Sequence, residues 1–454
     1  MKIKVFQTKL KYADFDYNEK VLDKYLGFDG LSVFPSLKFS KKSFDYYEKV
    51  ALSYPDKTFV FGTILVHDGK IFDVKNDYFE YENKKIYVSE KYSENIKCDL
   101  YILVKNNYFT MMGTEYLIEN ITTHSDFILV NSVMMADENI YAGQSFAKNK
   151  NNELVMKLPV CEESICEVDF EKNIEEVYEC VEEQVYKVLT FALKEYMENC
   201  GFKKVILGLS GGIDSALTAV LASDAIGSEN VHTVMLPSMY SSKGSIDDSV
   251  KLVQNIGIST EEVSITPLFN AFMDNVAKEK KGDLAEENLQ SRLRGLILMF
   301  KSNRDGYLLL STGNKSEVAT GYGTLYGDMC GGLNLIADLT KTNVYKLAKW
   351  INRNNEIIPQ NIIDKAPSAE LRPNQKDQDS LPDYDVLDDI IEMFFEQELS
   401  IEDIYAKYDK TLVDNLIKKF YNNEFKRRQA CLGIRLTENA FCSNIKLPIS
   451  SKDF

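Results

Sequence analysis

Residues 207–216 read Leu-Gly-Leu-Ser-Gly-Gly-Ile-Asp-Ser-Ala, and they join a strand-like run at 204–207 to a helix-forming run at 216–222. An order of strand, glycine- and serine-rich turn, and helix is what a phosphate-binding site requires. The glycines let the backbone approach the anion, while N–H groups of the turn and the positive end of the helix dipole face it. This stretch therefore predicts an α/β unit with a phosphate site, and a plain strand-to-helix turn is the alternative.

Three side chains of this turn can contribute to the site. Ser210 and Ser215 offer hydroxyl donors, and Asp214 can hold a magnesium ion against the phosphates. The turn lacks the Gly-x-x-x-x-Gly-Lys-Ser/Thr pattern of the common P-loop. Its Ser-Gly-Gly-x-Asp-Ser pattern instead resembles the loop of the ATP pyrophosphatases, enzymes that adenylate a substrate and release pyrophosphate.

Composition limits what else the protein can be. A chain of 454 residues accommodates two or three domains, and its net charge of −16 argues against a nucleic-acid-binding surface. No apolar run approaches the length of a membrane span, and the first residues are expected to form a strand rather than a signal peptide. The eight scattered cysteines and three histidines indicate ordinary thiols, no zinc site and a reducing, cytoplasmic compartment.

The pattern along the chain predicts two α/β units. Residues 1–165 alternate short apolar runs with polar breaks and helical patterns, which is typical of layered α/β folds. Residues 166–198, acidic and amphipathic from 170 onward, are expected to form a linking helix. Residues 199–454 continue the alternation, which predicts a doubly wound, Rossmann-like parallel sheet that binds ligands at the carboxyl ends of its strands. The part beyond about residue 375 is expected to be helical.

Several polar groups of the second unit are candidates to lie beside the phosphate loop. Gln290 and Arg294 fall one turn apart on a predicted helix, although a solvated helix edge explains them equally well. Lys341 lies next to a predicted helix start, where an amine suits a phosphate charge. The stretch 311–328 follows a strand of buried type and carries five possible ligand groups, namely Thr312, Lys315, Glu317, Thr320 and Asp328. Among these, Glu317 is a natural second carboxylate for magnesium.

Taken together, these stretches resemble the NAD synthetase family, which amidates nicotinic acid adenine dinucleotide (deamido-NAD). The resemblance covers essentially all of 200–454. It is carried by the motifs at 210–215, 237–242, 311–317, 326–328, 338–341, 365–373, 379–387 and 426–429. It implies that ATP is a co-substrate, that an acyl-adenylate forms with release of pyrophosphate, and that ammonia then gives NAD and AMP. It also implies a homodimer or larger homo-oligomer, and segment 373–385 is a candidate lid.

The resemblance assigns roles residue by residue. Asp214 and Glu317 would hold Mg²⁺ and act in catalysis together with Lys341. The residues expected to bind ATP are Gly208, Leu209, Ser210, Gly211, Gly212, Ile213, Asp214, Ser215, Thr312, Lys341 and Ser368. The residues expected to bind deamido-NAD are Gln290, Arg294, Lys315, Asp328 and Lys426.

The first unit resembles the nitrilase-like glutaminase domain that precedes many NAD synthetases. That domain frees ammonia from glutamine with a Glu–Lys–Cys triad. Here Ser36 stands in the motif that carries the glutamate, Ser89 stands where the cysteine is expected, and the stretch that carries the lysine is cut short. Cys98 lies nearby without an obvious activating partner. We therefore expect a degenerate glutaminase domain and ammonia as the nitrogen donor.

Other functions stay open at this stage. Glutamine remains a possible donor, through a different nucleophile of this chain or through a separate glutaminase subunit. A different adenylating amidotransferase, related to the GMP or asparagine synthetases, is a second alternative. A nucleotide-binding sensor without turnover is a third, and pyrophosphate release distinguishes it from an enzyme.

Overall fold

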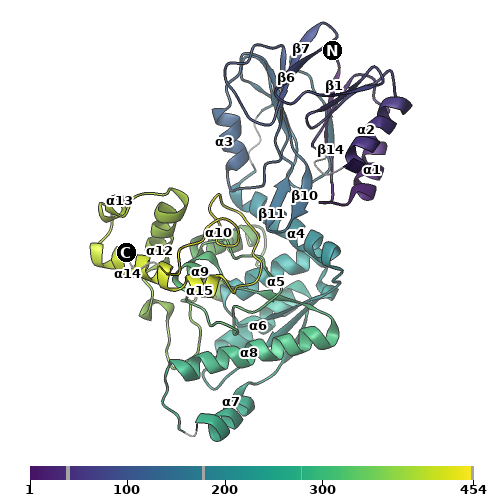
Figure 1. Cartoon of the computed structure of the whole chain (residues 1–454). Coiled ribbons are helices and arrows are strands. Elements are labelled where there is room, and N and C mark those ends of the chain that lie inside the picture. The colour runs from purple at the N-terminus through teal and green to yellow at the C-terminus, as the bar shows by residue number, and fades with distance from the viewer. Residues whose placement is uncertain (37–40, 176–178, 278, 451–454) are drawn as a thin grey trace. The chain divides into compact units, whose positions relative to one another are not determined.

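The structure is a computed structural model that describes residues 1–36, 41–175, 179–277 and 279–450. It divides into two compact units, residues 1–188 and 189–454. The boundary between them falls inside helix α4 (Val181–Cys200). Each unit combines strands and helices in layers, so the predicted α/β class is confirmed (Figure 1).

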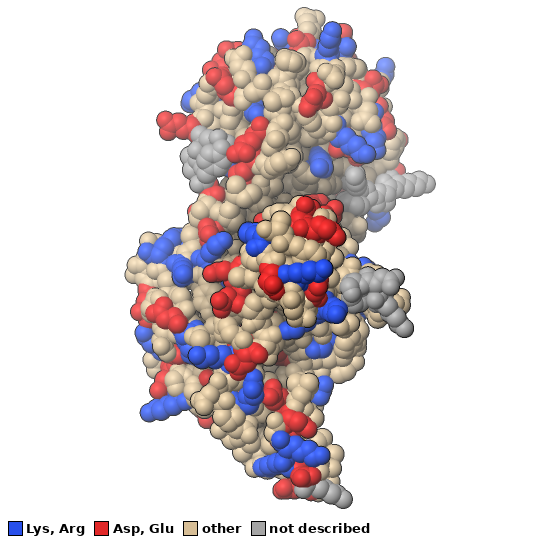
Figure 2. All heavy atoms as spheres, turned by 90° about the vertical axis from the view of Figure 1, so that its left-hand side faces the viewer, with Lys and Arg blue, Asp and Glu red and all other residues tan. Residues whose placement is uncertain are grey.

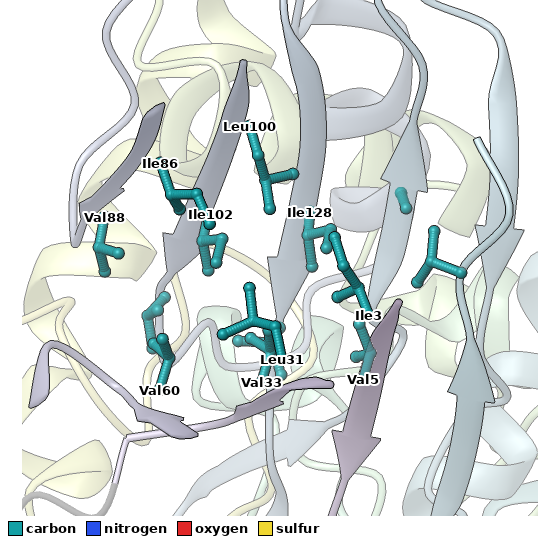
Figure 3. Packing of buried hydrophobic residues seen from close by; sticks show 14 of the residues in the cluster. Ile3, Val5, Leu31, Val33, Val60, Ile86, Val88, Leu100, Ile102 and Ile128 are labelled. Carbon is teal, nitrogen blue, oxygen red and sulfur yellow. The ribbon is translucent and has the colours of Figure 1, made fainter. Parts of the chain in front are cut away.

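The first unit contains two six-stranded sheets whose apolar faces enclose a common core. Figure 3 shows this core, in which Val5 and Val33 of one sheet lie opposite Ile102 and Ile128 of the other. The first sheet has the order β14 (Ser164–Glu167), β1 (Ile3–Gln7), β2 (Leu31–Phe34), β3 (Thr58–Phe61), β4 (Ile64–His67), β5 (Lys70–Asp73). The second has the order β13 (Leu154–Lys157), β12 (Phe146–Lys148), β9 (Asp126–Val130), β8 (Leu100–Val104), β7 (Lys84–Ser89), β6 (Asp77–Tyr81).

Helices cover the outer faces of both sheets. Helices α1 (Phe15–Asp23) and α2 (Lys41–Ser53) pack on the first sheet, and α3 (Gly113–Asn120) packs on the second. Strands β10 (Val133–Ala136) and β11 (Asn139–Ala142) form a separate hairpin. The result is a four-layer α-β-β-α arrangement, because each sheet is apolar on both faces.

The expected linking helix is shorter than predicted. Helix α4 begins only at Val181, and residues 164–167 form strand β14, which pairs antiparallel with β1. Beyond that strand, the Ile174 N–H donates at 3.0 Å to the carbonyl of Leu154, which begins β13 in the second sheet. The predicted helix start was therefore wrong: residues 164–167 pair with β1, and among the described residues the helix begins only at Val181. Residues 176–178 lie outside the described residues.

The second unit contains a five-stranded parallel sheet. Its order is β17 (Ser259–Glu262), β16 (Val231–Met235), β15 (Val205–Gly208), β18 (Leu308–Ser311), β19 (Leu333–Asn334). From β15 the chain adds β16 and then β17 on one side. It then crosses to the other side of β15, where it adds β18 and β19. The predicted doubly wound sheet is confirmed, and its topological switch point lies between β15 and β18.

Helices lie on both faces of this sheet. Helix α5 (Ile213–Ile226) contacts β15 and β16 together with α6 (Lys243–Ile256) and α10 (Lys341–Ile351), and α8 (Leu284–Asp305) contacts β15 and β18. The shorter helices are α7 (Thr266–Phe272), α9 (Lys315–Thr320) and α11 (Gln360–Asp364). After residue 375 the chain is mainly helical, with α12 (Tyr384–Ile391), α13 (Ile401–Tyr405), α14 (Lys410–Asn422) and α15 (Glu424–Arg427). These last helices bury an apolar cluster of their own.

No helix among the described residues is long and apolar enough to cross a membrane. Basic and acidic side chains are interspersed over the face that Figure 2 presents. The excess of acidic residues in the composition is therefore not gathered into one patch on that face.

Candidate active site

The phosphate loop lies at the carboxyl end of the central strand. Strand β15 ends at Gly208, and α5 begins at Ile213 with Gly212 as its N-cap. The N-cap glycine offers no side-chain hydrogen bond to the first turn of α5. The helix therefore keeps backbone N–H groups free for a ligand anion, at the positive end of its dipole.

Serine hydroxyls and one glycine fix the shape of this loop. The Ser210 and Ser215 hydroxyl oxygens lie 3.1 Å apart, and the Gly212 N–H donates to Ser210 Oγ at 3.2 Å. Gly211 has a φ of +76°, and a Cβ atom there would lie 2.3 Å from the Ser245 carbonyl oxygen. Glycine is required at 211 because its backbone conformation is left-handed and the neighbouring chain leaves no room for a side chain.

Two carboxylates and a lysine converge beside the loop. Lys341 Nζ lies 2.5 Å from Asp214 Oδ2 and 3.5 Å from Glu317 Oε1. Asp214 comes from the first turn of α5, Glu317 from the first turn of α9, and Lys341 begins α10. The three charged groups thus come from the N-terminal turns of three helices, and Glu317 and Lys341 lie beside the phosphate loop, as expected from the sequence.

Asn314 holds both carboxylates in place. Its side-chain amide donates to Asp214 Oδ1 at 2.9 Å and accepts from the Glu317 N–H at 3.0 Å. The Glu317 carboxylate in turn accepts the Asn314 N–H at 3.2 Å, which completes a capping box at α9. Sequence reasoning missed this residue, although the Asn-x-x-Glu spacing is the signature of such a box.

The charges of this cluster strongly affect one another. Burial raises the pKa of Glu317, Lys341 opposes the rise, and Asp214 and Asp377 add to it, so that the pKa comes to about 8. Burial lowers the pKa of Lys341, but the attraction of Asp214 and Glu317 outweighs it and raises that pKa overall. One buried ammonium therefore faces an excess of negative charge, a setting that favours an additional cation.

Asp377 is a further carboxylate at this site, and sequence reasoning did not select it. It is buried on the short 3₁₀ helix Asp377–Asp379, inside the candidate lid 373–385. Its two oxygens accept hydrogen bonds from the Tyr322 hydroxyl at 3.1 Å and the Tyr384 hydroxyl at 2.8 Å. Proximity to these carboxylates and burial raise the pKa of both tyrosines, so both remain donors.

Asp214, Glu317, Lys341 and Asp377 line one cavity of about 310 Å³ at the switch point. Most of the expected ligand residues line it, and Asp377, Lys365 and Glu370 line it in addition. The expected residues found in the lining are Gly208, Leu209, Ser210, Gly212, Ile213, Asp214, Ser215, Arg294, Thr312, Glu317, Asp328, Lys341 and Ser368. Gly211 is not part of the lining, and its carbonyl accepts a hydrogen bond from the Lys365 amine at 2.9 Å.

Arg294 and Asp328 lie together at the α8 side of the cavity. Arg294 Nε donates to the Leu236 carbonyl at 3.0 Å, and burial lowers the pKa of this arginine to about 10. Burial raises the pKa of Asp328, whose carboxylate accepts from Ser291 Oγ at 3.1 Å. A half-buried guanidinium that lines the cavity and has capacity for further acceptors suits an anionic or carbonyl group of a ligand.

Three residues expected at the dinucleotide are engaged elsewhere and are absent from the cavity lining. Lys315 is 1% exposed, and its amine lies 2.7 Å from the Asp338 carboxylate and 2.5 Å from that of Glu396. The Lys426 amine donates to two backbone carbonyls of the turn 321–323, at 2.8 and 2.9 Å. The Gln290 amide donates to the Leu371 carbonyl at 2.9 Å. This placement argues against direct ligand contacts, because each of these donors already has a protein acceptor.

In the first unit, Ser89 is buried at the end of β7. Its hydroxyl lies 2.6 Å from the Lys91 carbonyl and 2.9 Å from the Tyr101 hydroxyl. Ser36 follows β2 and packs against Gly62, where a Cβ atom would lie 2.8 Å from its side chain. The Cys98 thiol donates to Ser125 Oγ at 3.4 Å, and burial raises the pKa of this thiol. None of these three groups is placed beside a general base by the contacts in the described structure.

Among the described residues, no group of three His, Cys, Asp or Glu side chains is arranged to hold a metal ion. Asp214 and Glu317 nevertheless fit Mg²⁺, which typically takes one or two protein carboxylates and completes its shell with phosphate oxygens and water. Both carboxylates lie within 3.5 Å of the Lys341 amine, so they are close enough together to face one cation.

Comparison with known proteins identifies similar sequences and structures. The family model for NAD synthase matches residues 185–430. The glutamine-dependent NAD(+) synthetase of Synechocystis sp. is 42% identical over 356 residues, which cover 74% of this chain and 64% of that protein. The counterpart from Thermotoga maritima is 46% identical over 277 residues, which cover 60% and 48%. The chain thus spans about half to two thirds of the length of these curated relatives.

Two solved structures match nearly the whole chain. A glutamine-dependent NAD+ synthetase from Acinetobacter baumannii, in complex with adenosine diphosphate, is 29% identical with a TM-score of 0.71, over 99% of this chain and 98% of that one. A glutamine-dependent NAD(+) synthetase from Cytophaga hutchinsonii is 18% identical with a TM-score of 0.79, over 100% and 98%. The second likeness is one of fold alone.

Proposed function

Because the chain belongs to the NAD synthase family, we propose that it converts deamido-NAD to NAD at the expense of ATP. The observation that carries the proposal is the meeting of Asp214, Glu317 and Lys341 beside the phosphate loop, inside one cavity. The complex of the Acinetobacter baumannii relative with ADP supports an adenine nucleotide as one ligand.

In the proposed reaction, the nicotinate carboxylate attacks the α-phosphate of ATP. The bond from the α-phosphorus to the bridging oxygen breaks, pyrophosphate leaves, and an acyl-adenylate remains. Ammonia then attacks the acyl carbon, which gives NAD and AMP and releases a proton. The free N–H groups at the start of α5 and the Lys341 amine stabilise charge as it moves onto the leaving phosphates.

The remaining roles follow from the cavity. Asp214 and Glu317 would hold Mg²⁺, whose chemistry here is to neutralise phosphate charge. Arg294 and Asp328 would contact the dinucleotide from the α8 side, and Ser368 would contact ATP from the opposite segment. Asp377 and its two tyrosines would order the 373–385 segment over the adenylate and limit the entry of water.

For the nitrogen donor we propose ammonia, with the first unit as a degenerate glutaminase domain. Support comes from the residues: Ser36 and Ser89 stand where a base and a thiol are expected, and the Ser89 hydroxyl is bound to Tyr101 and a backbone carbonyl. A serine without a neighbouring base is a poor nucleophile. The family match begins at residue 185 and so does not bear on this unit.

Glutamine is the second candidate donor, and the comparisons favour it over ammonia. The relatives are named glutamine-dependent, and the Acinetobacter baumannii structure covers both units of this chain. Use of glutamine would require a nucleophile other than the residue at 89, or a separate glutaminase subunit.

One assay tests the reaction and its donor. The purified chain is incubated with ATP, Mg²⁺ and deamido-NAD, with either ammonium or glutamine, and NAD, AMP, pyrophosphate and glutamate are measured. Equal amounts of NAD, AMP and pyrophosphate from ammonium are expected, with no glutamate from glutamine. Glutamate release coupled to NAD formation would overturn the ammonia proposal. An absence of NAD with both donors would overturn the reaction itself.

Two further elements belong to this proposal. The chain is proposed to act in the cytoplasm, as its eight scattered cysteines led us to expect. It is also proposed to assemble as a homodimer or larger homo-oligomer, and sedimentation velocity of the purified chain tests that assembly.

A further inference from the structure

The cavity has two facing walls that come from distant parts of the chain. One wall is the turn 237–242 and the start of α6, and the other is the loop 365–371. Glu370 joins them. Its carboxylate accepts three hydrogen bonds from the first wall: from the Ser242 N–H at 3.2 Å, from Ser242 Oγ at 2.8 Å and from Ser245 Oγ at 2.7 Å.

This carboxylate lies at the N-terminus of α6, where unpaired N–H groups and the helix dipole attract an anion. In an ATP site that position would also attract a phosphate group. In this structure the Glu370 carboxylate occupies that position. The N-terminus of α5, by contrast with that of α6, has no side-chain cap. Of these two helix ends, it is therefore the one whose N–H groups can bind an anion.

The backbone at Glu370 is held in an uncommon conformation. Its φ is +47°, in the left-handed region that a glutamate rarely adopts. Such a conformation persists only where surrounding contacts impose it, and it is often found at ligand sites. The Glu370 N–H donates to Ser368 Oγ at 3.1 Å, so the same residue sets the position of the serine expected to touch ATP.

Lys365 extends the connection to the phosphate loop. Its amine donates to the Gly211 carbonyl at 2.9 Å and to Ser245 Oγ at 2.9 Å. Ser245 therefore contacts both Glu370 and Lys365, and through them the loop 365–371 is tied to α6 and to the turn that binds phosphate.

We propose that Glu370 is a positioning residue for ATP. By docking on Ser242 and Ser245 it holds the loop 365–371 closed, with Ser368 turned toward the nucleotide. This inference rests on the proposed function, because it assigns the cavity to ATP. It adds a role for a residue that touches neither metal nor phosphate.

The test compares the steady-state kinetics of Glu370→Ala, Glu370→Gln and the wild type with ammonium as donor. Glu370→Ala is expected to raise KM for ATP by about tenfold, with kcat changed by less than about threefold, since the lost contact supports ground state and transition state alike. KM for deamido-NAD should stay within about twofold. Glu370→Gln, which keeps an acceptor oxygen, should recover part of the loss. Glu402→Gln on α13, exposed and outside the cavity, is the matched control.

A double-mutant cycle with Ser242→Ala shows whether the two residues act together. Ser242→Ala alone should weaken ATP use, and it should add little in the Glu370→Ala background. Circular dichroism and thermal unfolding without nucleotide show whether each variant is folded. If Glu370→Ala fails to fold, Glu370→Gln and the single variant Ser242→Ala decide the question, and an unchanged KM for ATP in both would overturn the proposal.

Unchanged KM for ATP in a folded Glu370→Ala variant would overturn the proposal. A lower kcat together with an unchanged KM for ATP would overturn it as well, because such a variant would still bind ATP normally. Both outcomes require an active wild type, so they differ from a failure of the proposed function, in which the wild type itself makes no NAD.

Discussion

The Lys341 amine lies 2.5 Å from a carboxylate oxygen of Asp214, and both groups are brought together from helices 127 residues apart in sequence. The lysine is 2% exposed, so this ion pair is shielded from water. Its position beside the phosphate loop gives it two tasks. It balances the charge of the neighbouring carboxylates, and in the proposed reaction it would also meet phosphate charge.

Replacement of this lysine should abolish turnover. Lys341→Ala is expected to lower kcat/KM at least about a hundredfold, because a buried transition-state contact is lost. Continuous pyrophosphate release measures the effect. Lys349→Ala, at an exposed position of the same helix, should retain near wild-type activity. Comparable activity of the two variants would contradict the role of Lys341.

Binding of Mg²⁺ should release a proton in a pH-dependent way. Since the pKa of Glu317 is raised to about 8, its carboxyl is mostly protonated at pH 7 and must ionise to hold a metal. Proton release is expected to approach one per site at pH 7 and to vanish near pH 9. Titration calorimetry with a Mg²⁺-saturated, non-hydrolysable ATP analogue, in buffers of differing ionisation enthalpy, measures it. An equal release by Glu317→Gln would show that another group titrates.

The tyrosine pair at Asp377 should matter for turnover. Tyr384→Phe removes one of two hydrogen bonds to a buried carboxylate, an interaction worth about 1.5–3 kcal/mol. We expect kcat/KM to fall about tenfold or more as the carboxylate shifts. Tyr405→Phe removes a similar hydroxyl–carboxylate contact, to Asp414, away from the cavity, and should leave the kinetics unchanged. Equal kcat/KM values for both variants would show that the hydrogen bonds to Asp377 play no part in turnover.

Lys315 should prove to be a stability residue rather than a ligand. Lys315→Met leaves the buried carboxylates of Asp338 and Glu396 without their cation, which typically costs about 3–5 kcal/mol. Urea unfolding should show this loss, while KM for deamido-NAD stays close to wild type. Lys407→Met breaks an exposed pair with Asp389 and should cost less than about 1 kcal/mol. A large rise in KM for deamido-NAD with normal stability would restore Lys315 as a ligand.

Ser89 should be dispensable for the ammonium-dependent reaction. Ser89→Ala removes only a hydroxyl that is bound to Lys91 and Tyr101. NAD formation from ammonium is expected to match the wild type, as followed by absorbance after coupling to a dehydrogenase. If the wild type uses glutamine and Ser89→Ala does not, the hydroxyl is a nucleophile after all.

The strands and the phosphate loop were accessible from sequence because local signals agree there. Strands β1, β3 and β8 are each a short apolar segment between polar breaks, which is the pattern that predicted the layered fold of residues 1–165. The loop at 208–212 combined glycines, serines and a helix start. At such places local preference and final structure coincide.

Other features depend on partners that no local pattern reveals. The acidic run from 170 has helical periodicity, yet its first residues follow a strand that pairs with β1 from the opposite end of the unit. Lys315 lies among ligand-type residues, but its side chain meets Asp338 and Glu396, and the latter is 81 residues away in sequence. Asp377 looks like an ordinary loop carboxylate until Tyr322 and Tyr384 are placed around it.

Gly211 also limits how such a protein can evolve. Any side chain at 211 would collide with the backbone of Ser245, so the phosphate loop and the start of α6 cannot drift independently. A lineage that adapts to another nucleotide or acid must keep these two segments in register.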